Sequence, residues 1–202
     1  MTNALPQRQL DEFTPQLPPG LKMAIEIMTP DYEKEIIALI DSLQLEQAVQ
    51  PEMGRRYIRA FGWGYDSRNY DLIPTDPLPA ELEPLRHVAA EFAGKDPDDF
   101  EHCMISRFEP GASIPWLKMR GMWQHLVGIS LGNPLPIAFR KEQGEGQLCA
   151  DTTLAPRTMY LLADQARHDY EHSFPATDQP RWCLWFRDFS DEGRKLTEQF
   201  RG

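Results

Sequence analysis

The sequence predicts an α+β domain in which N-terminal helices flank a C-terminal β-sandwich or jelly roll. Before residue 100, two segments carry apolar residues at helical spacing. After residue 100, short apolar runs alternate with turns rich in Gly, Pro and Asp. These runs are HCMISRFE, HLVGISLG, PIAFRK, RTMYLLA and RWCLWFRDF. The length of 202 residues suits one domain with a substantial core.

The first predicted elements are an arm, a strand and a helix. Residues 1–20 are rich in Pro and polar groups and indicate a loose arm, and 21–28 alternate as a strand does. Thr29 and Pro30 have the residue types of a helix N-cap and first helical position. A helix is therefore expected over 30–44. Its buried face would carry Ile36, Ile37, Ile40 and Leu43.

A second helix is expected over 79–92, with Gly94 as its stop. Pro84 lies inside this span, which indicates that the regular helix begins only there. Between the two helices, residues 53–74 mix aromatic residues, arginine and glycine. That mixture is too irregular to predict a core element.

Composition limits the classes of partner. The net charge is −10 and the pI is about 5.0, which disfavours a wide basic face for duplex nucleic acid. Cys103, Cys149 and Cys183 form no zinc or disulfide pattern. There is no apolar run of membrane-spanning length and no signal-peptide pattern at the N-terminus. A cytoplasmic protein without membrane contact is expected.

Familiar catalytic motifs such as GxGxxG, the P-loop, GxSxG and HExxH are absent from the sequence. Five histidines remain as candidates, and a single histidine is more often structural than a ligand. His172 differs in its surroundings, because Arg167 precedes it and an arginine-rich strand follows it. Asp164 with His168 or His172 could form an acid–base or metal fragment, but a surface turn explains Asp164 better.

The segment RWCLWFR, 181–187, places two arginines six residues apart. In a strand, Arg181 and Arg187 share one face with Cys183 and Trp185. Both faces of this strand carry large apolar groups. Arginine keeps its charge, so a cation near a core needs an anion or a set of acceptors. Taken alone, the segment is better explained by two arginines at the rim of the core, each reaching a nearby carboxylate.

Read together, FEPGASIPW, ISLG, RTMYLLADQARHDYEHSFP and RWCLWFRDF resemble the AlkB family of iron(II)- and 2-oxoglutarate-dependent dioxygenases. The resemblance runs from about Arg55 to Phe189, and the paired arginines after a histidine are its most specific part. It implies a double-stranded β-helix, another name for this jelly roll. It also implies a single domain over 21–202, with a substrate-facing lid over 54–76.

The resemblance assigns the paired arginines to the co-substrate 2-oxoglutarate. Arg181 would hold the distal carboxylate and Arg187 would lie nearer the oxo-acid end. The Cα atoms of the two arginines would be ~20 Å apart in a strand, which leaves room for a small dicarboxylate between their side chains. Ser106 would donate a further hydrogen bond. Phe108 departs from the tyrosine common in the family, which predicts weaker co-substrate affinity.

The resemblance also assigns an iron site, and here the sequence departs from the family. His172 matches the second histidine ligand. The expected His-x-Asp pair is replaced by Leu117, Lys118 and Met119. Leucine has no donor atom and a thioether is a poor ligand for iron(II), so iron binding is not expected. His125 and Asp164 do not lie at family ligand positions. A natural variant and a deliberate replacement of ligands both remain open, with replacement favoured.

For substrate, the resemblance implies oxidation of an alkyl group, typically on a damaged nucleobase. Trp63, Tyr65 and Trp116 could stack on a flat ring, with Arg167 beside them. An equally good interpretation is that the lid aromatics only close over the core. The acidic charge favours a small or single-stranded nucleic-acid substrate, bound by a monomer.

The leading hypothesis is therefore an AlkB-like dioxygenase scaffold whose native activity is lost or redirected. The alternative is a non-catalytic binding protein for a small acid or a modified base, which uses the same pocket. A third hypothesis is a structural jelly roll without a ligand.

Overall fold

Two antiparallel sheets form the body of the protein in the computed structural model, which describes residues 17–48, 53–66 and 71–200. The larger sheet has the strand order β1 (Leu21–Ala24), β11 (Thr158–Leu162), β8 (Trp123–Leu131), β13 (Arg181–Phe189), β6 (His102–Phe108), β3 (Arg56–Phe61) and β2 (Glu46–Gln47). The smaller sheet has the order β10 (Gly146–Leu154), β9 (Leu135–Gln143), β12 (Glu171–Phe174) and β7 (Ile114–Leu117).

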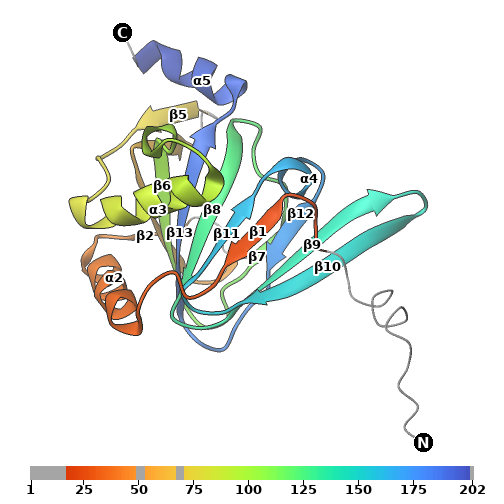
Figure 1. Ribbon diagram of the computed structural model, residues 1–202, viewed down its shortest axis with the longest axis horizontal. Coiled ribbons are helices and arrows are strands. Elements are labelled where there is room, and N and C mark those ends of the chain that lie inside the picture. Colours follow the sequence, from red (N-terminus) through yellow and green to blue (C-terminus); the bar gives the residue numbers. More distant parts are fainter. Residues whose placement is uncertain (1–16, 49–52, 67–70, 201–202) are drawn as a thin grey trace, which may run out of the picture.

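Helices cover one side of the larger sheet. Figure 1 shows α2 (Pro30–Ser42) and α3 (Glu83–Ala93) on that side, whereas the β9–β10 hairpin projects on the opposite side. The short helices α4 (Asp164–His168) and α5 (Asp191–Thr197) lie beyond strand ends. This arrangement is the α+β jelly roll with N-terminal flanking helices that the sequence predicts.

Local sequence explains both flanking helices. The Thr29 side chain accepts a hydrogen bond from the Tyr32 amide, and Pro30 opens α2, as predicted. A 3₁₀ turn over Ala80–Leu82 precedes α3, so the regular helix begins one residue before Pro84. Gly94 ends it with a φ of 66°, a left-handed conformation that glycine adopts without strain.

The structure differs from the sequence predictions at several strands. The strand predicted over 21–28 is shorter, because β1 ends at Ala24. The prediction that 53–74 holds no core element is wrong for β3, whose six residues pair with β6 inside the larger sheet. The predicted arm 1–20 falls outside the described residues up to position 16. The strands β7, β10 and β12 were not predicted, because they are short or largely polar.

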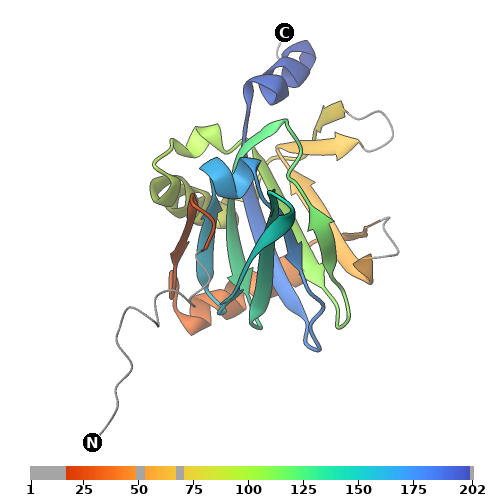
Figure 2. The same cartoon turned by 90° about the vertical axis from the view of Figure 1, so that its right-hand side faces the viewer.

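The remainder of the predicted lid is a separate hairpin, β4 (Trp63–Asp66) with β5 (Asp71–Pro74). Figure 2 shows this hairpin near the C-terminal helix α5. A hydrogen bond from Gln199 Nε2 to Asp71 Oδ2, 3.1 Å long, ties the hairpin to the C-terminal segment. None of the helices in the described part of the chain is long and apolar enough to cross a membrane.

The larger sheet separates two hydrophobic clusters. The outer cluster lies between this sheet and the helices, and includes Ile36, Ile40, Leu85, Ile105, Ile129, Leu184 and Phe186. The inner cluster lies between the two sheets, and includes Phe108, Leu126, Leu135, Phe139, Tyr160, Phe174 and Trp185. Alternation along the central strands sends successive side chains to these two clusters.

Candidate functional site in the jelly roll

Strand β13 carries the predicted arginines on its inner face. Cys183 and Trp185 belong to the inner cluster, whereas Leu184 and Phe186 belong to the outer one. Because side chains two residues apart share a face, Arg181 and Arg187 also face the interior. The structure therefore places both arginines between the two sheets.

Arg181 is buried without a counter-charge. Its side chain is fully buried, and all three guanidinium nitrogens lack a hydrogen-bond partner among the described residues. The guanidinium carbon lies 4.0 Å from the ring centre of Phe108. Burial lowers the pKa of Arg181, and the neighbouring Cys183 opposes that effect. However, burial raises the pKa of Cys183 to about 11, so its thiol is neutral at neutral pH and leaves the cation uncompensated.

Buried hydroxyl groups form a row across the larger sheet, two residues along β13 from Arg181; we call it the hydroxyl row. In this row Ser106 pairs with Cys183, Cys183 with Ser130, and Ser130 with Thr158. The three hydroxyl oxygens are buried and have no hydrogen-bond partner in the described structure. Three strands, β6, β8 and β11, thus present hydroxyl groups without partners in the same region as Arg181 of β13, which is unusual because buried polar groups are normally hydrogen-bonded.

Arg187 lies at the other end of this face and is half-buried. Its Nη1 is 3.1 Å from Nε2 of His102. Burial and the charge of Arg187 hold the pKa of His102 well below its usual range, so the ring is neutral. Since arginine only donates, Nε2 accepts this hydrogen bond and Nδ1 carries the proton. That Nδ1–H is buried without a partner in the described chain.

His172 lies on the facing sheet, directly opposite Leu117 in the β12–β7 register. The His172 ring is buried and packs edge-on against Phe174, with ring centres 5.7 Å apart. Burial, with Arg187 and Arg167 nearby, lowers the pKa of His172 to about 4. Leu117 packs against the inner cluster, and Met119 is part of it. Leu117, which the sequence predicts to occupy the first ligand position, is thus the strand neighbour of His172.

The lid aromatics have internal partners. Trp63 is 9% exposed and makes edge contacts with Phe189 and Phe200, each with ring centres 5.8 Å apart. The hydroxyl of Tyr65 accepts a 2.8 Å hydrogen bond from Arg120, whose guanidinium also covers the Tyr65 ring at 4.1 Å. This geometry matches the interpretation that the lid aromatics close over the core. Their role toward substrate stays a prediction.

Trp116 and Arg167 have other chain groups as partners. Trp116 is 37% exposed, and Arg140 covers its ring at 4.5 Å. Arg167 is buried and donates to the main-chain carbonyls of Met119, Arg120 and Trp123. The Arg167 side chain therefore fixes the loop after β7, and its substrate role also stays a prediction.

Asp164 and His168, the weaker candidates, are exposed at the two ends of α4.

A histidine–carboxylate pair that the sequence did not predict is formed by His125 and Asp188, in which His125 Nδ1 lies 2.8 Å from Asp188 Oδ2. Lys95 Nζ is 3.3 Å from the same oxygen. Burial raises the pKa of Asp188, but the bonds and charges of His125 and Lys95 outweigh this and lower it. The carboxylate thus serves to join two strands and the loop after α3.

The sequence analysis also did not single out two residues of the hydroxyl row. Ser130 and Thr158 are polar residues within apolar runs, at positions that alternation directs to the interior. That signal was available in ISLG and RTMYLL. The sequence does not reveal the strand register, which aligns both residues with Ser106.

Comparison with known proteins adds evidence on ancestry. No family model matches the chain. The tRNA (carboxymethyluridine(34)-5-O)-methyltransferase alkbh8 of Xenopus tropicalis is 25% identical over 168 residues, which are 79% of this chain and 26% of that protein. The Macaca fascicularis protein of the same name is 24% identical over 181 residues, 84% of this chain and 26% of its own length. The chain thus spans about a quarter of these relatives.

Solved structures share the fold. The structure of OsALKBH1 matches with a TM-score of 0.64 and 11% identity, over 86% of this chain and 98% of that one. A 2OG-Fe(II) oxygenase family oxidoreductase from Burkholderia pseudomallei matches with a TM-score of 0.58 and 16% identity, over 84% and 85%. A Pseudomonas putida prolyl-4-hydroxylase gives 0.57 and 11%, over 83% and 92%. These matches show that the chain has the jelly-roll fold of 2OG-Fe(II) oxygenase structures.

The AlkB resemblance implies an iron ion, and the residues present do not fit one. In the described segments, no group of three or more His, Cys, Asp or Glu side chains could hold a metal ion. His172 faces an aliphatic side chain in Leu117, and Met119 offers only a thioether. Iron(II) in such oxygenases requires two imidazoles and a carboxylate.

The implied co-substrate is a different case, because an acidic ligand fits the orphaned cation. A carboxylate would satisfy the Arg181 guanidinium, which is planar and matches carboxylate geometry. The buried hydroxyls of Ser106 and Ser130 could donate to the same ligand. The described interior thus holds a buried cation without a hydrogen-bond partner and no group of three metal donors.

Proposed function

We propose that this chain uses the AlkB-type jelly roll to bind a small carboxylic acid at Arg181, without iron-dependent oxidation. One observation carries the proposal, namely that Arg181 is fully buried and all three of its guanidinium nitrogens lack a partner in the described structure. An isolated buried cation destabilises a fold by several kcal/mol. A bound carboxylate removes that cost by charge-assisted hydrogen bonds.

Loss of the oxidation step follows from the side chains around His172. Oxidation in this fold depends on a metal that holds the oxo-acid and activates oxygen. With Leu117 opposite His172 and Met119 packed in the inner cluster, this chain supplies one imidazole where three donors are needed. The acid bound at Arg181 is then a ligand and not a consumed co-substrate.

The alternative ligand, a modified base, has less support. Trp63, one of the predicted stacking residues, makes edge contacts with Phe189 and Phe200. Tyr65 is held by Arg120. Both aromatic side chains already have partners within the chain, so recognition of an acid is the better proposal.

Binding is tested by isothermal titration calorimetry with small carboxylic acids in buffer that contains a metal chelator. We expect heat of binding with the wild type and none with Arg181→Met, which keeps much of the side-chain volume without the charge. Arg86→Met is the matched control, because Arg86 lies on α3 and pairs with Glu83 outside the barrel. Equal binding by the wild type and Arg181→Met would contradict the proposal.

The missing metal site is tested separately by metal analysis after anaerobic incubation with iron(II). The wild type should retain little iron. The double variant Leu117→His with Met119→Asp should retain about one iron per chain, because it restores the family donor set next to His172. Stoichiometric iron in the wild type would show that donors other than these hold the metal.

A further inference from the structure

Trp185 stands between the two arginines on the inner face of β13. It lies four residues from Arg181 and two from Arg187, which is about 14 Å and about 7 Å along the strand. The Trp185 side chain is 2% exposed and is among the largest fully enclosed groups of the chain. An extended ligand that reaches from one arginine to the other must therefore pass the position of this indole.

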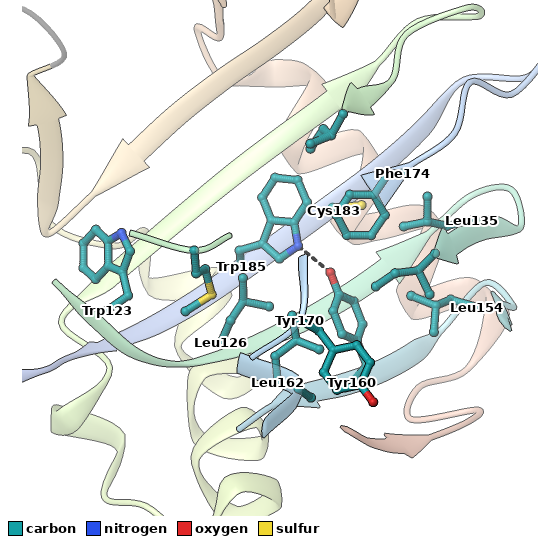
Figure 3. Close-up of a cluster of buried hydrophobic side chains, with 14 of the residues drawn as sticks. Trp123, Leu126, Leu135, Leu154, Tyr160, Leu162, Tyr170, Phe174, Cys183 and Trp185 are labelled. Atoms are coloured by element: carbon teal, nitrogen blue, oxygen red, sulfur yellow. Dashed lines mark hydrogen bonds between the residues drawn. The ribbon is translucent and has the colours of Figure 1, made fainter. Parts of the chain in front are cut away.

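The indole is held firmly from both sheets. Its Nε1 donates a 2.6 Å hydrogen bond to the hydroxyl of Tyr160, as Figure 3 shows. Phe174 of the smaller sheet lies 6.0 Å away between ring centres, and Phe108 of the larger sheet lies 6.1 Å away. Contacts on both sides of the barrel make Trp185 a partition across its interior.

The Tyr160 partner is itself fixed. A Cβ on Gly128 would come within 2.2 Å of the Tyr160 ring, so only glycine leaves room for the ring at this point. Tyr160 and Trp185 both pair with Gly128 in the strand register. The ring pair therefore cannot shift toward the larger sheet to make room for a ligand.

This partition divides the polar groups into two sets. Arg181, Cys183 and the hydroxyl row lie on one side of Trp185 along β13. Arg187 and His102 lie on the other side. Only the first set contains a fully buried cation without a partner among the described residues.

We propose that Trp185 is a specificity-determining residue, which restricts the Arg181 site to short monocarboxylates and excludes the five-carbon diacid 2-oxoglutarate. This inference rests on the proposed function. The single carboxylate meets Arg181, and the short remainder of the ligand lies beside Cys183 and the Ser106 and Ser130 hydroxyls. A second carboxylate would meet the apolar indole, where it would lose hydration without gaining a partner.

The test compares pyruvate with 2-oxoglutarate, which share the oxo-acid group and differ in length and in the second carboxylate. Calorimetry on the wild type should give at least tenfold tighter binding of pyruvate. Trp185→Thr should bind 2-oxoglutarate at least tenfold more tightly than the wild type does. Trp182→Thr is the matched control, since Trp182 lies on the opposite face of the same strand and should change neither affinity.

Trp185→Phe serves as a second, milder variant, because it keeps an aromatic ring and loses the hydrogen bond to Tyr160. It should shift the preference in the same direction by a smaller factor. Equal affinity of the wild type for both acids overturns the role of Trp185 and leaves the proposed function standing. Unchanged preference in both Trp185 variants has the same meaning. Failure of the wild type to bind any small carboxylic acid overturns the proposed function itself.

Discussion

The two faces of the larger sheet treat buried charge in opposite ways. On the outer face, Glu33 is buried, and its carboxylate accepts hydrogen bonds from the Gly132 amide at 2.8 Å and from Arg157 at 3.0 Å. On the inner face, Arg181 is buried and its guanidinium has no hydrogen-bond partner among the described residues. The buried charge of α2 against the outer face thus has partners, whereas the buried charge of β13 on the inner face has none in the described structure.

The difference separates stability from function. The outer face joins the helices to the sheet, and it combines apolar packing with a charge that the chain itself satisfies. The inner face leaves the Arg181 cation and several hydroxyl groups without hydrogen-bond partners in the described structure, at a cost in stability. Groups that a fold leaves unsatisfied inside are the ones that a ligand can use.

The largest expected effect is on the outer face. Phe186→Ala should lower the free energy of unfolding by about 3–5 kcal/mol, because it opens a cavity next to Phe100. Urea denaturation measures this loss. Affinity for pyruvate should not change in the fraction that remains folded. A matching loss of affinity would show that the two faces are not independent.

Acid should act through the inner face. The pKa of His172 is about 4 in the folded protein, against an ordinary value of 6.5. Between these two values the unfolded chain binds a proton at His172 and the folded chain does not. The contribution of neutral His172 to the free energy of unfolding is therefore fully present above pH 6.5 and is lost as the pH falls toward 4. This shift amounts to roughly 3 kcal/mol over that range.

Unfolding measured between pH 7 and pH 4 tests this expectation. His172→Gln should show a weaker loss of stability with acidification, and His87→Gln, on the exposed face of α3, should follow the wild type. Identical pH profiles for the wild type and His172→Gln would mean that the His172 ring is not buried as described.

The smallest expected effect is a gain. Without ligand, Arg181→Met should raise the free energy of unfolding by about 2 kcal/mol, because it removes a buried charge that the chain does not compensate. Thermal or urea unfolding of the ligand-free protein measures the gain. A large loss of stability instead would show that the Arg181 cation has a structural partner, and the contrast between the two faces would then disappear.

Sequence patterns predicted much of the architecture because they depend on local chemistry. Thr29 with Pro30 marked the start of α2, and Gly94 marked the end of α3. Apolar runs located β6, β8, β9, β11 and β13. The apolar pattern did not predict β3, because arginines interrupt it. Pairing with β6 is what makes this segment a strand.

For the candidate site, the sequence alone determined that Arg181 and Arg187 share a face of one strand, that Leu117 has no donor atom and that Met119 offers only a thioether. These conclusions follow from the two-residue period of a strand and from which side chains carry donor atoms. Only the tertiary structure decided that Leu117 faces His172, that Ser106, Ser130 and Thr158 align, and that Trp185 lies across the interior. Register and packing between the sheets join residues far apart in the chain, and no local pattern specifies that geometry.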